Sequence, residues 1–239
     1  MSVLWSCNDG VATITLDRPE ARNAVNLALC DGLIDAARRA GADAAVRVVL
    51  VRANGPAFCA GADLKERQGM DEAQVRERRA RGFAAYAALE ALPMPAIAVV
   101  HGPAVGSGCE IAAACDFIVA TPGASFRTPE ALRGTVGATQ RLPRVLGKRL
   151  AKDLMFTGRA LTAQEAMLGG LVARIVAPED LEQVIQDICK GIVTAPPDAV
   201  RLAKRAIDRG VELDPQGALA AELEAIEAQL ASGQWMGRR

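Results

Sequence analysis

Two predominantly apolar runs constrain the fold most strongly: VRVVLVRA at residues 46–53 and AIAVVHG at residues 96–102. Strands of this kind occur where both faces of a sheet are covered, which is typical of the parallel sheets of α/β proteins. Residues 11–17, VATITLD, instead alternate apolar and polar side chains, which indicates a half-buried strand. We therefore expect a sheet in which at least two strands are covered on both faces.

Helix signals separate and follow these strands. Asn26 can cap a helix that runs to about residue 40, and Asp71 and Gln74 form a capping-box pattern at the start of a second helix. The succession of strand, helix, strand and helix predicts a β/α winding, and hence the α/β class.

The last third of the chain has a different pattern. Thr162 and Glu165 form another capping box, the helix they begin stops at Gly169 and Gly170, and a strand-like segment, LVARIV, follows. Three amphipathic segments then carry apolar side chains at helical spacing; such stripes are more often core or subunit contact than ligand site, so we give them no catalytic role. We divide the chain into a core of residues 1–190 and a C-terminal helical region of residues 191–239.

Composition excludes several function classes. With 51% hydrophobic residues among 239 the chain can bury a large core, and its 28 basic residues balance its 28 acidic ones, which gives no signature of nucleic-acid or acidic-membrane binding. No apolar run approaches the ~18 residues that cross a bilayer, and the first ten residues lack a signal-peptide pattern, so we expect a cytoplasmic protein. The six cysteines form no CxxC pair and accompany a single histidine, which predicts reduced thiols and no zinc site.

Residues 102–116, GPAVGSGCEIAAACD, invite three motif interpretations, and each fails. A dinucleotide fingerprint needs a third glycine where Ile111 stands, and no acidic residue ends a second strand at the required distance. The P-loop pattern of glycines followed by lysine is absent. Ser107 as a nucleophile would depend on His101, which lies at a strand end without the G-x-S-x-G elbow, so a structural role suits this histidine better.

What this stretch does supply is backbone donors. A helix that begins near Gly106 or Ser107 leaves its first amide hydrogens unpaired, and these can stabilise an oxygen that gains charge. A second turn of small residues, FCAGADLKE at residues 58–66, also follows an apolar strand. The two turns could converge into an oxyanion hole, or they could be no more than tight connections between strands and helices.

Two glutamates complete the candidate chemistry. Glu110 falls in the first turn of an alanine-rich helix that should be buried, where a carboxylate is costly unless it is used or paired. Glu130 follows SFRTP, in which Pro129 forces the preceding residue into an extended conformation; taken alone, Glu130 could be a helix-start or surface residue. Two carboxyl groups beside paired amide donors are suited to proton transfers next to a carbonyl.

At this point the chain resembles the enoyl-CoA hydratase/isomerase family, the crotonases. The resemblance rests on five motifs in the family's order: LDRPEARNAVN, AFCAGADLKE, PAIAVVHGPAVGSGCEIAAACDFIVA, FRTPE and TQRLPRVLGKRLAKDLMFTGR. It implies a spiral of ββα units with a helical C-terminal region that trimerises, as a homotrimer or a dimer of trimers. It also implies coenzyme A thioesters as substrates, with no metal or redox cofactor.

The resemblance also assigns roles to individual positions. Ala62 and Ser107 would donate their amides to the thioester oxygen, Glu110 would activate the water that attacks the β-carbon of a 2-enoyl thioester, and Glu130 would protonate the α-carbon. The segments that contact coenzyme A in the family correspond here to Ala21, Arg22, Ala60, Asp63, Leu64 and Lys65. Lys65 could pair with the phosphates of the coenzyme or remain a solvated surface lysine.

Three features depart from the family pattern. Ser107 stands where many members have glycine, which adds a hydroxymethyl group beside the thioester. Residues 134–142, GTVGATQRL, are shorter than the usual loop, one amide of which helps to hold the catalytic water in hydratases. The chain ends at ASGQWMGRR, before the aromatic and basic segment that many members place at the coenzyme or the trimer contact.

Three functions therefore remain in view. The first is hydration of 2-enoyl-CoA thioesters to 3-hydroxyacyl-CoA. The second is isomerisation of 3-enoyl-CoA to 2-enoyl-CoA, which could use Glu130 as the sole proton shuttle. The third is an acyl-CoA-binding protein with little turnover. Glu110 separates them, because neither alternative has much reason to retain a buried carboxylate there.

Overall fold

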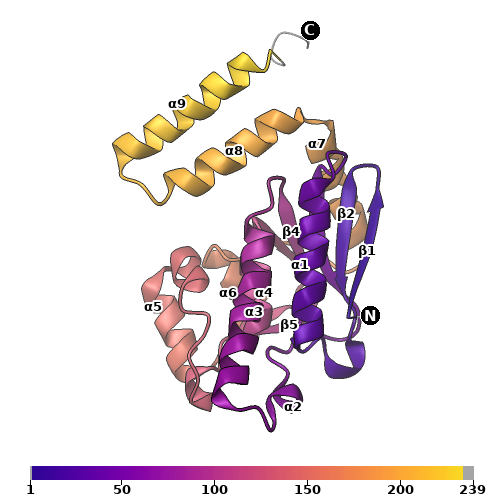
Figure 1. The fold of residues 1–239 in the computed structure, drawn as a ribbon, viewed down its shortest axis with the longest axis vertical. Coiled ribbons are helices and arrows are strands. Elements are labelled where there is room, and N and C mark those ends of the chain that lie inside the picture. The colour runs from indigo at the N-terminus through magenta and orange to yellow at the C-terminus, as the bar shows by residue number, and fades with distance from the viewer. Residues whose placement is uncertain (1, 234–239) are drawn as a thin grey trace.

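A computed structural model describes residues 2–233; residue 1 and residues 234–239, which include most of the terminal ASGQWMGRR, lie outside the described part. Its larger sheet has six strands in the order β1-β2-β3-β4-β6-β9, and its smaller sheet has the order β5-β7-β8 (Figure 1). The strands of the larger sheet are β1 (Val3–Asn8), β2 (Val11–Leu16), β3 (Val48–Ala53), β4 (Ala96–Val100), β6 (Phe117–Ala120) and β9 (Arg174–Ile175).

The larger sheet is parallel from β2 onward. β1 and β2 form an antiparallel hairpin whose two-residue turn, Asp9 and Gly10, has positive φ at both positions, as the twist of a tight hairpin requires. β2, β3, β4, β6 and β9 then pair in parallel. β2 buries every second side chain, whereas β4 is buried throughout and β3 over its first four residues, as the two sequence patterns predict.

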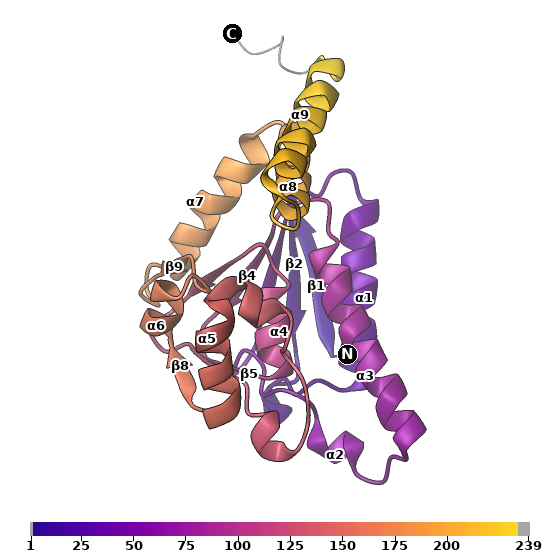
Figure 2. The ribbon, with the colours of Figure 1, turned by 90° about the vertical axis from the view of Figure 1, so that its left-hand side faces the viewer.

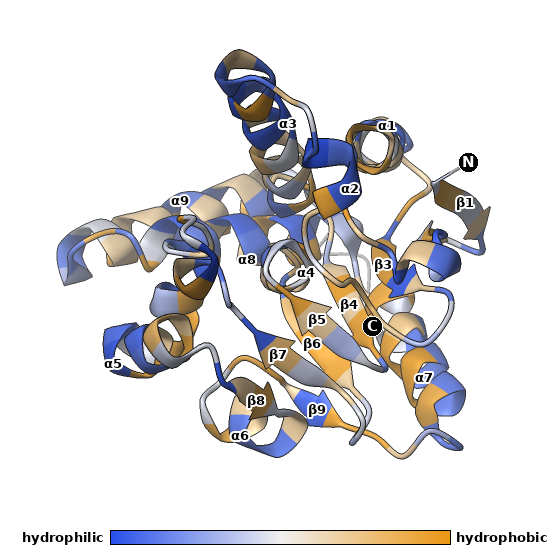
Figure 3. Ribbon diagram, turned by 90° about the horizontal axis from the view of Figure 1, so that it is seen from below, coloured by the Kyte–Doolittle hydropathy of each residue, from blue (hydrophilic) through white to orange (hydrophobic). Residues whose placement is uncertain are grey.

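Helices cover both faces of this sheet. α1 (Leu27–Ala42), α3 (Glu72–Glu90) and α4 (Ser107–Ala113) share one apolar core with residues such as Ile14, Val51 and Ala98. α7 (Leu181–Thr194) packs on the opposite face, where Ile185 meets a second apolar cluster that includes Leu50 and Val99. Figure 3 shows hydrophobic colour concentrated on the central strands, with α7 beside them. The mixed α/β class predicted from sequence is confirmed.

The smaller sheet has three short strands. Its strands are β5 (Pro103–Val105), β7 (Ser125–Arg127) and β8 (Ala160–Thr162); β5 and β7 are parallel, and β7 and β8 are antiparallel. In the sequence, α5 (Arg141–Thr157) comes directly before β8 and α6 (Ala163–Leu168) directly after it. Three short pieces complete the core: η1 (Pro19–Ala21), α2 (Leu64–Arg67) and η2 (Ala131–Arg133).

The C-terminal helices project away from both sheets. α8 (Pro197–Gly210) and α9 (Pro215–Ala231) lie side by side beyond the core in both views (Figure 1 and Figure 2). The domain boundary that we placed at residue 190 falls inside α7, which lies against the sheet. No helix in the described part of the chain is long and apolar enough to span a membrane.

The local helix signals of the sequence are confirmed. Asn26 caps α1 by accepting a hydrogen bond from the amide of Leu29. Both capping boxes are present, Asp71 with Gln74 at α3 and Thr162 with Glu165 at α6. These signals involve side chains and amides within three residues of each other, so they act regardless of the rest of the fold.

Candidate active site

A cavity of about 140 Å³ lies between the two small-residue turns and the inner face of α3. Both turns that the sequence analysis singled out line it, as do the first turn of α4 and residues 129–138. Ala62, Ser107, Glu110 and Glu130 are all part of its wall. The structure therefore brings together the four residues to which we assigned chemical roles.

The two turns meet through their backbones. Cys59 and Ala104 form a parallel bridge, in which the amide of Val105 donates to the carbonyl of Cys59 at 2.8 Å. Gly61 has φ +93°, and a Cβ there would lie 2.9 Å from the carbonyl oxygen of Val105. Only glycine allows this approach, so the two turns lie directly against each other, which is the first of the two arrangements that the sequence left open.

The amides of Ala62 and Ser107 are available as donors. Ser107 is the first residue of α4, and such a position has no partner within the helix. Among residues 2–233, neither the amide of Ser107 nor that of Ala62 donates a hydrogen bond. Two unpaired donors on one cavity wall are the geometric requirement for stabilising an oxyanion.

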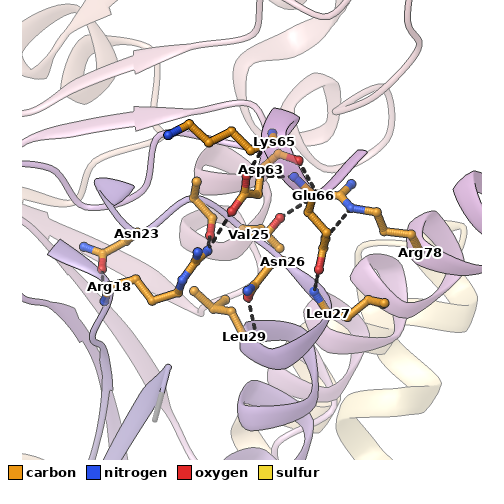
Figure 4. Close-up of polar contacts among 11 residues, drawn as sticks. Arg18, Asn23, Val25, Asn26, Leu27, Leu29, Asp63, Lys65, Glu66 and Arg78 are labelled. Atoms are coloured by element: carbon orange, nitrogen blue, oxygen red, sulfur yellow. Dashed lines mark hydrogen bonds and ion pairs between the residues drawn. The ribbon is translucent and has the colours of Figure 1, made fainter. Parts of the chain in front are cut away.

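A polar network fixes the turn that carries Ala62 (Figure 4). Asp63 caps α2 by accepting from the amides of Lys65 and Glu66 at 3.0 and 3.2 Å, and its other oxygen accepts from Arg18 at 3.0 Å. Burial acts to raise the pKa of Asp63, but the hydrogen bonds from the Glu66 amide and from Arg18 outweigh it and hold the pKa below its ordinary value. The side chain of Asp63 is thus engaged within the protein.

Arg78 of α3 ties this turn to the neighbouring helices. Its Nε donates to Glu66 at 2.7 Å and its Nη2 to the carbonyl of Val25 at 2.6 Å, while Glu66 accepts from the amide of Leu27 at the start of α1 (Figure 4). Val25 also forms a parallel bridge with Ala62. Because Arg78 is buried, these contacts are little screened by water, and they hold Ala62 against α1 and α3.

The other predicted coenzyme-binding positions are not all on the cavity wall. Ala60 and Leu64 line it, and the amide of Ala60 donates to the carbonyl of Arg22 at 2.9 Å, which joins the two predicted segments. Ala21 and Arg22 lie at the end of η1, where Arg22 has φ +50°. Lys65 is exposed on α2. Ala21, Arg22 and Lys65 do not line the cavity itself.

Glu110 projects from the first turn of α4 and has 4% of its surface exposed. Arg141, the first residue of α5, donates through Nη1 to Glu110 Oε2 at 2.8 Å and through Nη2 to Glu90 at 2.6 Å. Burial raises the pKa of Glu110 above its ordinary value, and the hydrogen bond and charge of Arg141 oppose that rise. The prediction that Glu110 lies in a buried helix is confirmed, whereas no pattern in the sequence identified Arg141 as its cationic partner.

Glu130 occupies a different environment. It precedes η2, and its Oε1 lies against Gly106, where a Cβ would come within 2.3 Å of it. Its Oε2 is buried and has no hydrogen-bond partner in the described part of the chain. Burial raises the pKa of Glu130, and the charge of Glu110 raises it further. The two carboxyl groups therefore share a cavity, but only one of them has a cation in contact.

The shortened loop reaches the cavity. Thr135, Val136, Gly137 and Ala138 all line it, and a Cβ on Gly137 would lie 3.1 Å from Cγ of Glu130. Ala138 is buried with φ +55°, a left-handed conformation that costs a non-glycine residue about 1 kcal/mol or more. The loop is thus packed directly on the second glutamate.

The structure also shows the surroundings of Ser107, His101 and the six cysteines. Burial raises the pKa of Tyr86, a residue of α3 on the cavity wall, and the nearby side chain of Ser107 opposes that rise. His101 contacts the carbonyl of Gly55 through Nε2 at 2.8 Å and is absent from the cavity wall, which agrees with a structural role. All six cysteines are unpaired thiols and all but Cys7 are buried, as expected.

The comparisons with known proteins agree with this geometry. The enoyl-CoA hydratase/isomerase family model matches residues 6–235. The short-chain-enoyl-CoA hydratase of Clostridium acetobutylicum is 40% identical, with 90% of this chain and 84% of that protein covered. Enoyl-CoA isomerase/hydratase fer4 of Mycosarcoma maydis is 37% identical over 93% of this chain and 86% of its own length. A crystal structure of an enoyl-CoA hydratase from Bacillus anthracis superposes with a TM-score of 0.92 at 39% identity, covering 95% of this chain and 90% of the other.

Proposed function

The chain belongs to the enoyl-CoA hydratase/isomerase family, and from this premise we propose that it hydrates 2-enoyl-CoA thioesters to 3-hydroxyacyl-CoA. The observation that carries the proposal is the unequal pair of carboxyl groups in one cavity: Glu110 is in contact with Arg141, whereas Glu130 makes no ion pair with any of residues 2–233. Hydration needs one group that accepts a proton and one that gives a proton. Environments that differ in this way favour that division of labour.

The proposed reaction uses only groups on the cavity wall. The thioester oxygen accepts hydrogen bonds from the amides of Ala62 and Ser107. Glu110 takes a proton from water as the water oxygen bonds to the β-carbon, and the electron pair of the double bond moves into the enolate. Glu130 then gives its proton to the α-carbon as the enolate collapses. Transfer of a proton from Glu110 to Glu130 through solvent restores the starting state.

The two amides supply the electrostatic part of catalysis. Charge builds on the thioester oxygen only when the β-carbon is attacked, so fixed donors at that point lower the barrier more than they strengthen substrate binding. No step in this scheme requires a metal or redox cofactor. Coenzyme A enters as part of the substrate, with the segments around Arg22 and Lys65 as its proposed contacts.

The direct test is the loss of enoyl-thioester absorbance with crotonyl-CoA, with the product identified by mass as the hydrated thioester. We expect turnover without any added cofactor. Calorimetric titration with crotonyl-CoA separates the failures: binding without loss of absorbance would contradict hydration, and the absence of binding would contradict the substrate class.

Isomerisation of 3-enoyl-CoA is the second candidate. The contact between Glu130 and Gly106 supports it, because a single carboxyl group beside the first turn of α4 could carry a proton from C2 to C4 of the acyl chain. Among the relatives, the enoyl-CoA isomerase/hydratase fer4 of Mycosarcoma maydis is 37% identical. A 3-enoyl-CoA substrate in the same absorbance assay distinguishes the two: an isomerase generates 2-enoyl-thioester absorbance, whereas a hydratase without isomerase activity leaves the absorbance unchanged.

We further propose that the protein assembles as a homotrimer or a dimer of trimers in the cytoplasm, without nucleic acid or membrane. An apolar groove runs between α8 and α9, and large side chains that line it stay exposed, among them Ile207 at 64% and Leu219 at 56%. Large apolar side chains that are grouped and exposed in this way are typical of a subunit contact.

Leu219→Lys is expected to shift the mass in solution from that of three or six chains toward that of one chain. A lysine in the groove would bury a charge at the contact without a partner. Light scattering coupled to size exclusion measures the mass. Gln216→Lys, an exposed position on the same helix, is the control and should keep the assembly. Equal masses for both variants would exclude this face as the contact.

A further inference from the structure

Arg141 reaches between two helices to contact a residue of the proposed catalytic pair. It begins α5, and its guanidinium bridges Glu110 of α4 at 2.8 Å and Glu90 of α3 at 2.6 Å. The exposed fractions of the side chains are 15% for Arg141, 6% for Glu110 and 54% for Glu90. The bridge therefore runs from the solvent-facing side of α3 into the buried first turn of α4.

We propose that Arg141 is a positioning residue that keeps the negative charge of the catalytic pair on Glu110 and so leaves the transferable proton on Glu130. The inference deepens the proposed hydration and rests on it for the roles of the two glutamates. Arg141 itself does not line the cavity, so it acts through Glu110 rather than on the substrate.

The groups around Glu110 support this assignment. Facing it are Glu90 and Tyr86 from α3, Glu130 from the segment after β7, and Arg141 from α5. Arg141 is the one cation in ion-pair contact with Glu110 within residues 2–233. An ionised carboxylate with so little exposure is costly unless a charged hydrogen-bond donor accompanies it. Arg141 supplies that donor.

Glu130 lacks the same support. The guanidinium groups of Arg79 and Arg133 act to lower its pKa, but neither makes an ion pair with it in the described part of the chain. Arg79 donates instead to the carbonyl of Val136 at 2.9 Å. A buried carboxyl oxygen without a partner is more stable when the group is neutral. The proton is therefore expected on Glu130.

The bridge also orients Glu110. Arg141 engages Oε2, so Oε1 is the oxygen that remains to accept the proton of water. The guanidinium lies 5.9 Å from the ring centroid of Tyr86, and Glu90 holds its outer nitrogen. A planar fork held at both ends fixes direction as well as charge, which a lysine ammonium does less well.

Replacing Arg141 with Gln tests the proposal through the pH dependence of kcat/KM for crotonyl-CoA. Loss of the cation raises the pKa of Glu110, so the acid limb is expected to move by about one pH unit or more toward higher pH, with about a tenfold fall in activity per unit below the limb. KM should change little because Arg141 does not contact the substrate. Arg141→Lys is expected to restore most of the limb position but less of kcat.

Two matched variants sharpen the test. Glu90→Gln removes a negative charge that raises the pKa of Glu110, so its acid limb should move the opposite way, toward lower pH. Arg144→Gln removes an arginine from the same helix that pairs with the exposed Glu212, and its pH profile should match that of the unmodified protein. A limb unmoved in Arg141→Gln, or moved equally in Arg144→Gln, would overturn the proposal.

An infrared pH titration of protein with ¹³C-labelled glutamate gives a readout independent of turnover. The carboxylate band that disappears in Glu110→Gln belongs to Glu110, and its midpoint should rise in Arg141→Gln. If this midpoint rises while crotonyl-CoA is not hydrated, the charge assignment stands and the hydratase function fails. If the midpoint is unchanged, the assignment is wrong whatever the activity.

Discussion

Replacing Glu110 with Gln is expected to lower kcat for crotonyl-CoA hydration by about 10²–10⁴-fold, the range typical of losing a general base, with little change in thioester binding. The amide keeps the size of the carboxyl group, and its oxygen can still accept from Arg141, so the first turn of α4 should be undisturbed. What is lost is the group that accepts the proton of water. Initial rates and calorimetric binding of crotonyl-CoA measure the two effects separately.

Glu90→Gln is the control for this change. Glu90 also contacts Arg141, yet it lies outside the cavity, so its replacement should preserve most of kcat. Hydratase turnover that survives in Glu110→Gln would refute the assigned role. The reverse ranking, with Glu130→Gln inactive and Glu110→Gln nearly normal on a 3-enoyl substrate, would identify an isomerase.

Ser107→Pro is expected to reduce kcat by about 10²–10³-fold, because losing one oxyanion donor costs about 3 kcal/mol of transition-state stabilisation. Proline suits the first position of a helix, where the amide has no helical partner, so the substitution removes the donor with limited disturbance of α4. KM should change less than kcat, since the donor matters most once the oxygen carries charge.

Ser107→Ala separates the amide from the side chain. Alanine keeps the amide and removes only the hydroxyl near Tyr86, so its kcat should stay within a few-fold of the original. Thermal unfolding of both variants verifies that α4 is intact. If the alanine variant loses as much activity as the proline variant while both remain folded, the hydroxyl rather than the amide would be the functional group.

Much of the fold was readable from short-range patterns. The buried strands β3 and β4 follow from continuous apolar runs, the half-buried β2 from alternation, and the starts of α1, α3 and α6 from capping side chains. The order of strands in the sheet was not predicted, nor was the separate sheet of β5, β7 and β8. Strand order depends on which segments pair across long stretches of chain, and no local pattern specifies that.

Some residues of the candidate site could be predicted from the sequence, and others could be found only in the structure. Glu110 attracted notice because a carboxylate in an alanine-rich helix is unusual, and the turns at Ala62 and Ser107 because glycine and small residues follow strands. Arg78 and Arg141 gave no comparable signal, since isolated arginines in helical segments are ordinarily solvated surface residues. Their partners, Val25 and Glu110, are 53 and 31 residues away in the chain.

The sequence by itself determined the α/β class, the helix caps and the presence of two carboxyl groups and two turns of small residues, because periodicity, capping and glycine conformation act over a few residues. Only the tertiary structure decided that Arg141 crosses to Glu110 and that Glu130 lies against Gly106 without a cation. The physical reason is that charge and burial at a site depend on which helices cross there. The electrostatic difference between two similar glutamates therefore arises only when α3, α4 and α5 pack together.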